Sequence, residues 1–167
     1  MTGAVEVLAE LRRRGQTLAT AESLTGGLIG GLLTDVPGAS ASYLGGVITY
    51  ATRLKATLAD VDEAVLTELG PVAAPTAAQM AAGVARRCHA DWGLAVTGVA
   101  GPDPQDGHPV GQVFVAVARV DGEPQVRELH LAGDRTAIRN RTAAAAIALL
   151  AEALGMDRAG SGVEAVW

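Results

Sequence analysis

The sequence predicts a single α/β domain, and three observations support this class. Strand-like and helix-like segments alternate along most of the 167 residues, and two strands joined by a tight turn precede the last long helix. Hydrophobic residues make up 49% of the chain and aromatic residues only 3%, so the core must be built from aliphatic side chains. Charged residues, at 19%, are too few for a disordered chain. A domain of this length can bury a substantial core.

The elements of the first half rest on the spacing of their apolar residues and on the residues that bound them. The first helix places Val5, Leu8 and Leu11 on one face, and Gly15 follows its last turn. The first strand leads into a glycine-rich helix, whose low propensity is reasonable for a helix that packs closely on a sheet. In chain order we expect helix 4–14, strand 17–22, helix 26–34, strand 43–50, helix 52–59 and helix 62–69.

The second half begins with an amphipathic helix whose inward face carries Met80, Ala81 and Val84. After a short apolar strand, two alternating segments joined through Asp121-Gly122 predict a β-hairpin. Asp134 is placed to cap the final helix. We expect helix 76–89, strands 92–96, 110–120 and 125–131, helix 137–154, a domain over 1–154 and a flexible tail over 155–167.

Composition argues against several classes of function. A net charge of −5 is unlike a duplex nucleic-acid binder, and the few aromatic residues offer no platform for single strands. Cys88, the single cysteine, cannot form an internal disulfide, and we expect it to be a half-buried core thiol. No apolar run approaches the ~20 residues of a membrane span, and the N-terminus is unlike a signal peptide. We expect a cytoplasmic protein with no membrane partner, and a positive mean hydropathy of +0.27 makes a homo-oligomer reasonable.

A proline- and glycine-rich loop over 102–110 contains Asp103, Asp106 and His108. These side chains are of the types that bind metals, but in such a loop they are more often solvated. We therefore expect no metal and no cofactor.

Ser23 lies at a predicted strand-to-helix junction, in the stretch Ala-Glu-Ser-Leu-Thr-Gly-Gly over 21–27. Helix N-termini present unpaired N–H groups and a partial positive charge, which suit a phosphate or an oxyanion. Two interpretations are open at this point: Ser23 or Thr25 caps the helix, or Ser23 is a nucleophile beside backbone donors.

Lys55 is the only lysine in a chain with twelve arginines. Lysine, unlike arginine, can lose its proton when it is desolvated, so Lys55 is a candidate general base; an ordinary surface lysine is the alternative. Both Ser23 and Lys55 follow predicted strands, and ligand sites in α/β sheets gather at the C-terminal ends of strands. If the two strands are parallel neighbours, the two side chains can converge.

The motifs of several enzyme classes are missing: GxSxG, SxxK, GxxxxGK[ST] and GxGxxG do not occur, and no histidine is flagged by its surroundings. What remains is a serine nucleophile with a lysine base, and amides at the start of the Gly26-Gly27 helix as an oxyanion hole. This supports acyl transfer from an amide or ester. Arg135 and Arg139, one turn apart, can hold a phosphate or make salt bridges on a solvated face.

Five motifs in register, spread over about 5–154, resemble the CinA C-terminal domain family. They are Ala-Glu-Ser-x-Thr-Gly-Gly at 21–27, Thr-Tyr-x-x-x-x-Lys at 49–55, Thr-Gly-x-Ala-Gly-Pro-Asp at 97–103, Pro-Val-Gly at 109–111 and Gly-Asp-Arg at 133–135. The resemblance implies a three-layer α/β/α domain with a mixed, mostly parallel sheet of about five strands. It also implies a stand-alone nicotinamide-nucleotide amidase, which hydrolyses nicotinamide mononucleotide to nicotinic acid mononucleotide and ammonia in pyridine-nucleotide recycling.

The same resemblance implies a Ser–Lys mechanism without metal or cofactor, with Ser23 as nucleophile and Lys55 as base. Tyr50, Thr97 and Arg139 match further positions around the family's site. With the glycine-rich turns and the two arginines, the expected substrate-binding residues are Thr25, Gly26, Gly27, Tyr50, Thr97, Gly98, Gly101, Arg135 and Arg139.

The chain also departs from the family's pattern. It has Ala51-Thr52 where the family usually has Ser-Asn, Val72-Ala73-Ala74 where the family has Val-Ser-Glu, and Leu24 where cysteine is common. These differences leave two further hypotheses open: a non-catalytic module that senses a nucleotide or docks a partner in competence or damage responses, and a hydrolase of another small amide.

Overall fold

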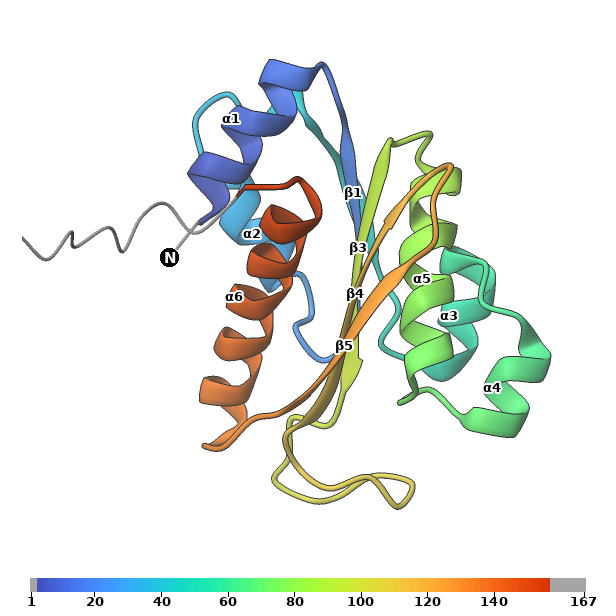
Figure 1. The fold of residues 1–167 in the computed structure, drawn as a ribbon. Coiled ribbons are helices and arrows are strands. Elements are labelled where there is room, and N and C mark those ends of the chain that lie inside the picture. The colour runs from blue at the N-terminus through green and yellow to red at the C-terminus, as the bar shows by residue number, and fades with distance from the viewer. Residues whose placement is uncertain (1–2, 157–167) are drawn as a thin grey trace, which may run out of the picture.

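Five strands form one sheet with helices on both of its faces in the computed structural model, which describes residues 3–156 (Figure 1). The predicted three-layer α/β/α arrangement is therefore confirmed. The strands are β1 Leu18–Glu22, β2 Tyr43–Ile48, β3 Trp92–Gly98, β4 Gln112–Arg119 and β5 Gln125–His130. The helices are α1 Ala4–Arg14, α2 Leu28–Thr34, the short 3₁₀ helix η1 Ala39–Ala41, α3 Thr52–Ala59, α4 Glu63–Leu69, α5 Ala74–Arg87 and α6 Arg135–Ala153.

The sheet is mixed, in the order β2-β1-β3-β4-β5. β1 pairs in parallel with both β2 and β3, whereas β4 runs antiparallel to β3 and to β5. Four of the five strands therefore point the same way. Because β1, β2 and β3 are parallel neighbours, their C-terminal ends meet at one edge of the sheet, the lower edge in Figure 1.

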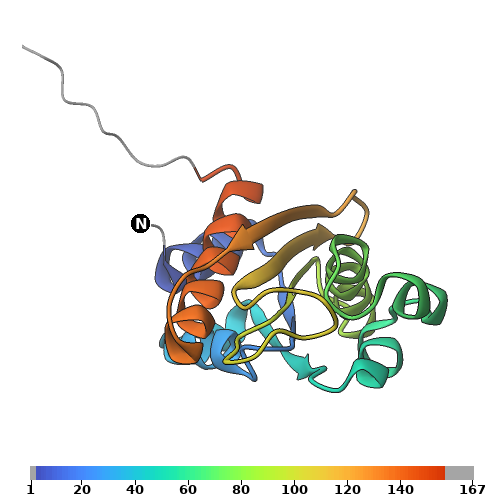
Figure 2. The ribbon, with the colours of Figure 1, turned by 90° about the horizontal axis from the view of Figure 1, so that it is seen from below.

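Each face of the sheet has its own aliphatic core. Helices α1, α2 and α6 cover one face and bury residues such as Leu11, Ile29 and Ile138, while α3, α4 and α5 lie on the other face, where Met80 and Val84 are fully buried (Figures 1 and 2). Small residues let α5 lie very close to the sheet. The inward positions predicted for α5 are confirmed, since Met80, Ala81 and Val84 are all inaccessible to solvent.

One prediction about an individual face is wrong. In α1, Val5 is 61% exposed and Val7 is buried instead, because the buried stripe, which packs toward α2 and α6, runs through Val7, Leu8 and Leu11. The hairpin of β4 and β5 forms as predicted, and residues 113–118 of β4 are all buried, since β4 packs between α5 and α6.

Several boundaries move by a few residues. β2 ends at Ile48, two residues earlier than expected, while β3 continues to Gly98. Asp134 caps α6 as predicted, by accepting a hydrogen bond from the amide of Ala137. Cys88 is half-buried, also as predicted. Most of the predicted flexible tail, 155–167, lies outside the described residues.

No helix within residues 3–156 is both long enough and apolar enough to cross a membrane. The same part of the chain contains no group of three or more His, Cys, Asp or Glu side chains that could hold a metal ion. In the loop after β3, His108 instead shares a hydrogen bond with Gln112, through Nδ1 and Oε1 at 2.8 Å.

Candidate active site

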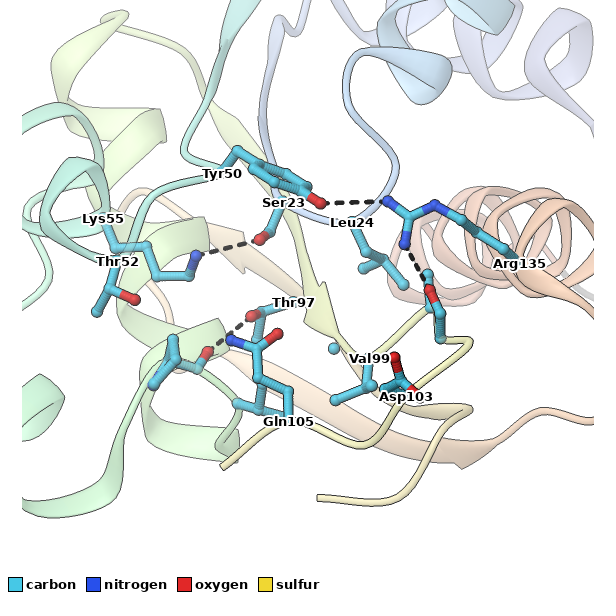
Figure 3. A pocket seen from close by; sticks show the side chains of 15 residues that line it. Ser23, Leu24, Tyr50, Thr52, Lys55, Thr97, Val99, Asp103, Gln105 and Arg135 are labelled. Atoms are coloured by element: carbon cyan, nitrogen blue, oxygen red, sulfur yellow. Dashed lines mark hydrogen bonds between the residues drawn. The ribbon is translucent and has the colours of Figure 1, made fainter. Parts of the chain in front are cut away.

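The C-terminal ends of β1, β2 and β3 surround a cavity of about 150 Å³ (Figure 3). β1 leads directly into Ser23, β2 leads through a short loop to α3 and Lys55, and β3 ends at Thr97 and Gly98. The loop after β3 and the first residue of α6 complete its wall. The lining residues are Ser23, Leu24, Tyr50, Thr52, Lys55, Pro71, Val72, Thr97, Gly98, Val99, Ala100, Gly101, Asp103, Gln105 and Arg135.

Ser23 and Lys55 face each other across this cavity. The Nζ atom of Lys55 lies 3.1 Å from the Oγ atom of Ser23 (Figure 3). It also donates a 2.7 Å hydrogen bond to the carbonyl oxygen of Thr49. The parallel pairing of β1 with β2 produces this contact, because it places the loop after β2 beside the end of β1. The amide of Thr49 in turn donates to the carbonyl of Glu22, at 2.7 Å. This backbone hydrogen bond thus links the loop that contacts Lys55 to the end of β1, directly before Ser23.

Lys55 is only 1% exposed and is the largest of the fully buried side chains of the described residues. Burial lowers the pKa of its ammonium group from 10.5 to about 8, because the charged form loses its hydration. Among residues 3–156, no carboxylate forms an ion pair with it within 4 Å. The alternative of an ordinary surface lysine is therefore wrong. A neutral amine is accessible near physiological pH, and it can accept the proton of the Ser23 hydroxyl while donating to Thr49.

The structure contradicts two expectations for the turn after Ser23: that the helix begins at Gly26, and that Ser23 or Thr25 caps it. α2 begins at Leu28, so Gly26 and Gly27 precede the helix rather than lying in it. Its N-cap is Gly27, with φ of 100°, a conformation that L-residues with a Cβ rarely adopt. Neither Ser23 nor Thr25 caps the helix. The side chain that does so is the carboxylate of Glu22, which accepts hydrogen bonds from three amides at the helix start: Gly27, Ile29 and Gly30.

The amides at the start of α2 therefore cannot serve as the predicted oxyanion hole, since Glu22 already uses them. The turn offers other donors. Within the described residues, the N–H groups of Leu24 and Thr25 donate no hydrogen bond, and Leu24 lines the cavity directly after Ser23. A backbone N–H immediately after a nucleophilic serine is a common oxyanion donor.

The structure brings five of the nine predicted substrate-binding residues to the cavity: Tyr50, Thr97, Gly98, Gly101 and Arg135. Arg135 reaches across the opening, where it donates to the carbonyl of Gly101 at 2.7 Å and to the hydroxyl of Tyr50 at 3.1 Å (Figure 3). The hydroxyl of Thr97 is turned away to the carbonyl of Pro71, at 2.6 Å.

The other four predicted residues, Thr25, Gly26, Gly27 and Arg139, do not line the cavity. Thr25 is fully buried, and its hydroxyl donates to Glu22 at 2.6 Å. Arg139 lies behind the turn, where its guanidinium donates to the carbonyls of Leu24 at 3.0 Å and Thr25 at 2.8 Å. Arg139 thus supports the turn, and Arg135 is the arginine at the cavity.

Two residues around the candidate site, Glu22 and Thr49, were not predicted from the sequence. An acidic residue at the end of the mainly apolar strand 18–22 was a usable signal, because a buried carboxylate needs several donors, and Glu22 has them. The role of Thr49 comes from its backbone carbonyl, which no sequence pattern reveals.

The departures from the family's pattern fall mainly at helix starts. Ala51 and Ala73 are the N-cap residues of α3 and α5, and neither provides a capping side chain. Of the other departing positions, Thr52 and Leu24 line the cavity, and Ala74 is the first residue of α5. The loss of polar groups at Ala51 and Ala73 therefore concerns the helix caps, and the cavity wall changes chiefly at Thr52.

Comparison with known proteins agrees with the resemblance. Residues 2–154 match the family model described as "CinA C-terminal domain". A CinA-like protein of Frankia casuarinae is 51% identical over 144 residues, which are 86% of this chain and 33% of that protein. A putative competence-damage inducible protein of Bacillus subtilis is 41% identical over 138 residues, 83% of this chain and 33% of that protein. The chain thus spans about a third of the length of these curated relatives.

Solved structures of similar size show the same fold. The competence/damage inducible protein CihA from Agrobacterium tumefaciens superposes with a TM-score of 0.86 at 37% identity, covering 91% of this chain and 93% of that chain. A CinA superfamily protein from Klebsiella pneumoniae superposes with a TM-score of 0.87 at 30% identity, covering 92% and 96% of the two chains. Because the family model covers residues 2–154 and the fold matches that of solved family members, the chain belongs to the CinA C-terminal domain family.

Proposed function

We propose that this protein is an amidohydrolase that removes ammonia from the carboxamide of nicotinamide mononucleotide. The observation that carries the proposal is the pair of Ser23 and Lys55: a serine hydroxyl 3.1 Å from a lysine amine whose pKa burial lowers to about 8, so that a substantial fraction of it is neutral at physiological pH. A serine hydroxyl beside a lysine that can be neutral, both lining one cavity, is the nucleophile–base arrangement that acyl transfer requires.

The chemistry follows from the contacts. The neutral amine of Lys55 accepts the hydroxyl proton while Ser23 Oγ forms a bond to the carboxamide carbon. The resulting oxyanion lies against the free N–H groups of Leu24 and Thr25, and the carbonyl of Thr49 holds the newly charged ammonium group of Lys55. Lys55 then returns the proton to the departing nitrogen, which leaves as ammonia. A water molecule then gives a proton to the same amine as its oxygen attacks the acyl carbon. Lys55 returns that proton to Ser23 Oγ as the ester bond breaks, and the product acid leaves and ionises to the carboxylate.

Arg135 is the residue that we assign to the substrate's phosphate. Its guanidinium lies in the cavity wall, and among the described residues 3–156 it donates only to neutral acceptors, a backbone carbonyl and a tyrosine hydroxyl. A phosphate is a stronger acceptor than either of them, and a guanidinium can bind it with two parallel hydrogen bonds. Arg139 is already engaged by two carbonyls of the turn.

The test is ammonia release from nicotinamide mononucleotide by the purified protein and by Ser23→Ala, Lys55→Ala and Lys55→Arg. We expect all three variants to lose at least about 1,000-fold in kcat, the arginine variant because its guanidinium cannot give up a proton. Ser40→Ala, an exposed serine outside the cavity, is the matched control and should keep full activity.

The other outcomes identify the competing hypotheses. Thermal stabilisation by the mononucleotide without ammonia release would favour a nucleotide-sensing module. Activity on other small amides, with none on the mononucleotide, would favour a hydrolase of a different substrate. Activity that survives both Ser23→Ala and Lys55→Ala would refute the mechanism.

A further inference from the structure

Glu22 is a buried carboxylate that the proposed chemistry does not use. It directly precedes Ser23, its side chain is 2% exposed, and no cation within residues 3–156 forms an ion pair with it. A buried carboxylate is costly unless its oxygens accept several hydrogen bonds.

Four donors converge on the carboxylate, and all of them belong to the eight residues that follow it. One oxygen accepts from the Thr25 hydroxyl at 2.6 Å and from the amides of Gly27 at 3.0 Å and Ile29 at 3.1 Å. The other accepts from the amide of Gly30 at 2.8 Å. The side chain thus ties the turn at 23–27 to the first turn of α2. That helix has only seven residues and contains two glycines, so it has little stability of its own.

The opposite side of the turn is held through its carbonyl groups. The carbonyl of Ser23 accepts from the amide of Gly26, and those of Leu24 and Thr25 accept from Arg139. In a trans peptide unit the C=O and N–H bonds point in opposite directions. Fixing the carbonyls of Ser23 and Leu24 therefore also fixes the directions of the Leu24 and Thr25 N–H groups, which the described chain leaves free.

We propose that Glu22 is a positioning residue for the reaction: its carboxylate holds the turn so that the hydroxyl of Ser23 and the free N–H groups of Leu24 and Thr25 face the substrate carbonyl together. Glu22 touches neither substrate nor reacting atoms in this scheme. It also occupies the positive end of α2, so that the oxyanion is drawn to the turn rather than to the helix start. This inference rests on the proposed acyl-transfer function of Ser23.

Glu22→Gln is the main test, because it keeps the shape of the side chain but replaces one acceptor oxygen by an NH₂ group that opposes the amide donors. We expect kcat per active site to fall about 100-fold, as when an oxyanion donor is misplaced, while KM for nicotinamide mononucleotide stays within about twofold. The midpoint of the pH–rate profile should not move, since Lys55 is untouched. Glu123→Gln, an exposed glutamate in the hairpin turn, is the matched control.

A substrate-independent measurement separates this inference from the proposed function. A fluorophosphonate probe labels a serine nucleophile and needs the same backbone donors, so its labelling rate at Ser23 should fall in Glu22→Gln in parallel with kcat. If wild-type Ser23 is labelled but no ammonia is released, the proposed function fails and the labelling rates still test Glu22. Absence of labelling in the wild type would overturn the inference.

Thr25→Val covers the case in which Glu22→Gln does not fold, because it removes only the 2.6 Å hydrogen bond to the carboxylate. We expect about tenfold slower labelling in Thr25→Val and nearly normal labelling in Thr25→Ser, which restores the hydroxyl. A folded Glu22→Gln protein with a labelling rate within twofold of the wild type would overturn the inference. So would wild-type labelling in Thr25→Val. A drop in thermal stability with unchanged labelling per folded molecule would show a purely structural role and would also overturn it.

Discussion

Replacing Lys55 by methionine should abolish catalysis and at the same time stabilise the fold at neutral pH. The side chain is 1% exposed, and burial lowers the pKa of its ammonium group from 10.5 to about 8. The folded state therefore disfavours the charged form relative to the unfolded chain. Methionine fills a similar volume without a charge, so it removes this penalty.

The magnitude follows from the pKa. A lowering from 10.5 to about 8 corresponds to a penalty of about 3 kcal/mol in the free energy of unfolding, which is fully present below pH 8. Methionine also loses the hydrogen bond to the Thr49 carbonyl, which costs about 1 kcal/mol. The expected net gain is about 2 kcal/mol at pH 7.

The pH dependence has a definite sign. Between pH 8 and 10.5 the folded lysine has lost its proton while the unfolded lysine still binds one, so the stability of the wild type rises with pH relative to the variant. The difference in free energy of unfolding that favours Lys55→Met should therefore shrink between pH 8 and 10.5 and be absent above that range.

Urea denaturation followed by circular dichroism, at pH 7, 9 and 10, measures this difference. Arg53→Met removes an exposed cation from the same helix and should change stability by less than about 0.5 kcal/mol at every pH. A Lys55→Met protein less stable than the wild type at pH 7, or a difference that is the same at pH 7 and pH 10, would refute the reasoning.

Four further predictions address the site and the packing. The value of kcat/KM should rise about tenfold per pH unit below pH 8 and level off above it, as the amine of Lys55 becomes neutral; a profile flat from pH 6 to 9 would contradict this. Arg135→Gln should raise KM for nicotinamide mononucleotide about tenfold with little change in kcat, and leave KM for the riboside, which lacks the phosphate, unchanged. Ala51→Ser should raise the free energy of unfolding by about 1 kcal/mol in urea titrations by supplying the missing cap of α3; no gain would show that the N-terminus of α3 needs no side-chain cap. Gly93→Ala should cost about 3 kcal/mol or prevent folding, because its Cβ would lie 1.9 Å from the Ala81 carbonyl oxygen of α5; normal thermal stability would rule out this close packing.

The sequence by itself was sufficient for the fold class and for the two central side chains of the site. Apolar periodicity located α1 and α5, because buried side chains recur with the helical period, although it misassigned Val5 of α1 to the buried face. The exceptional composition around Lys55, one lysine among twelve arginines, and the glycines after Ser23 marked the candidate nucleophile and base. Both signals are local in the sequence, so they can be recognised without knowledge of the tertiary contacts.

Only the tertiary structure decided how these residues are used. The parallel register of β1 with β2 brings Lys55 to 3.1 Å from Ser23, and burial between sheet and helices sets its pKa; neither quantity has a local signal. The donors available to an oxyanion likewise have no local signal in the sequence. The sequence suggested the amides that start α2, but the carboxylate of Glu22 occupies them, and Arg139, more than a hundred residues away along the chain, fixes the turn from behind. Hydrogen-bond partners are chosen by proximity in space, which spacing along the chain does not encode.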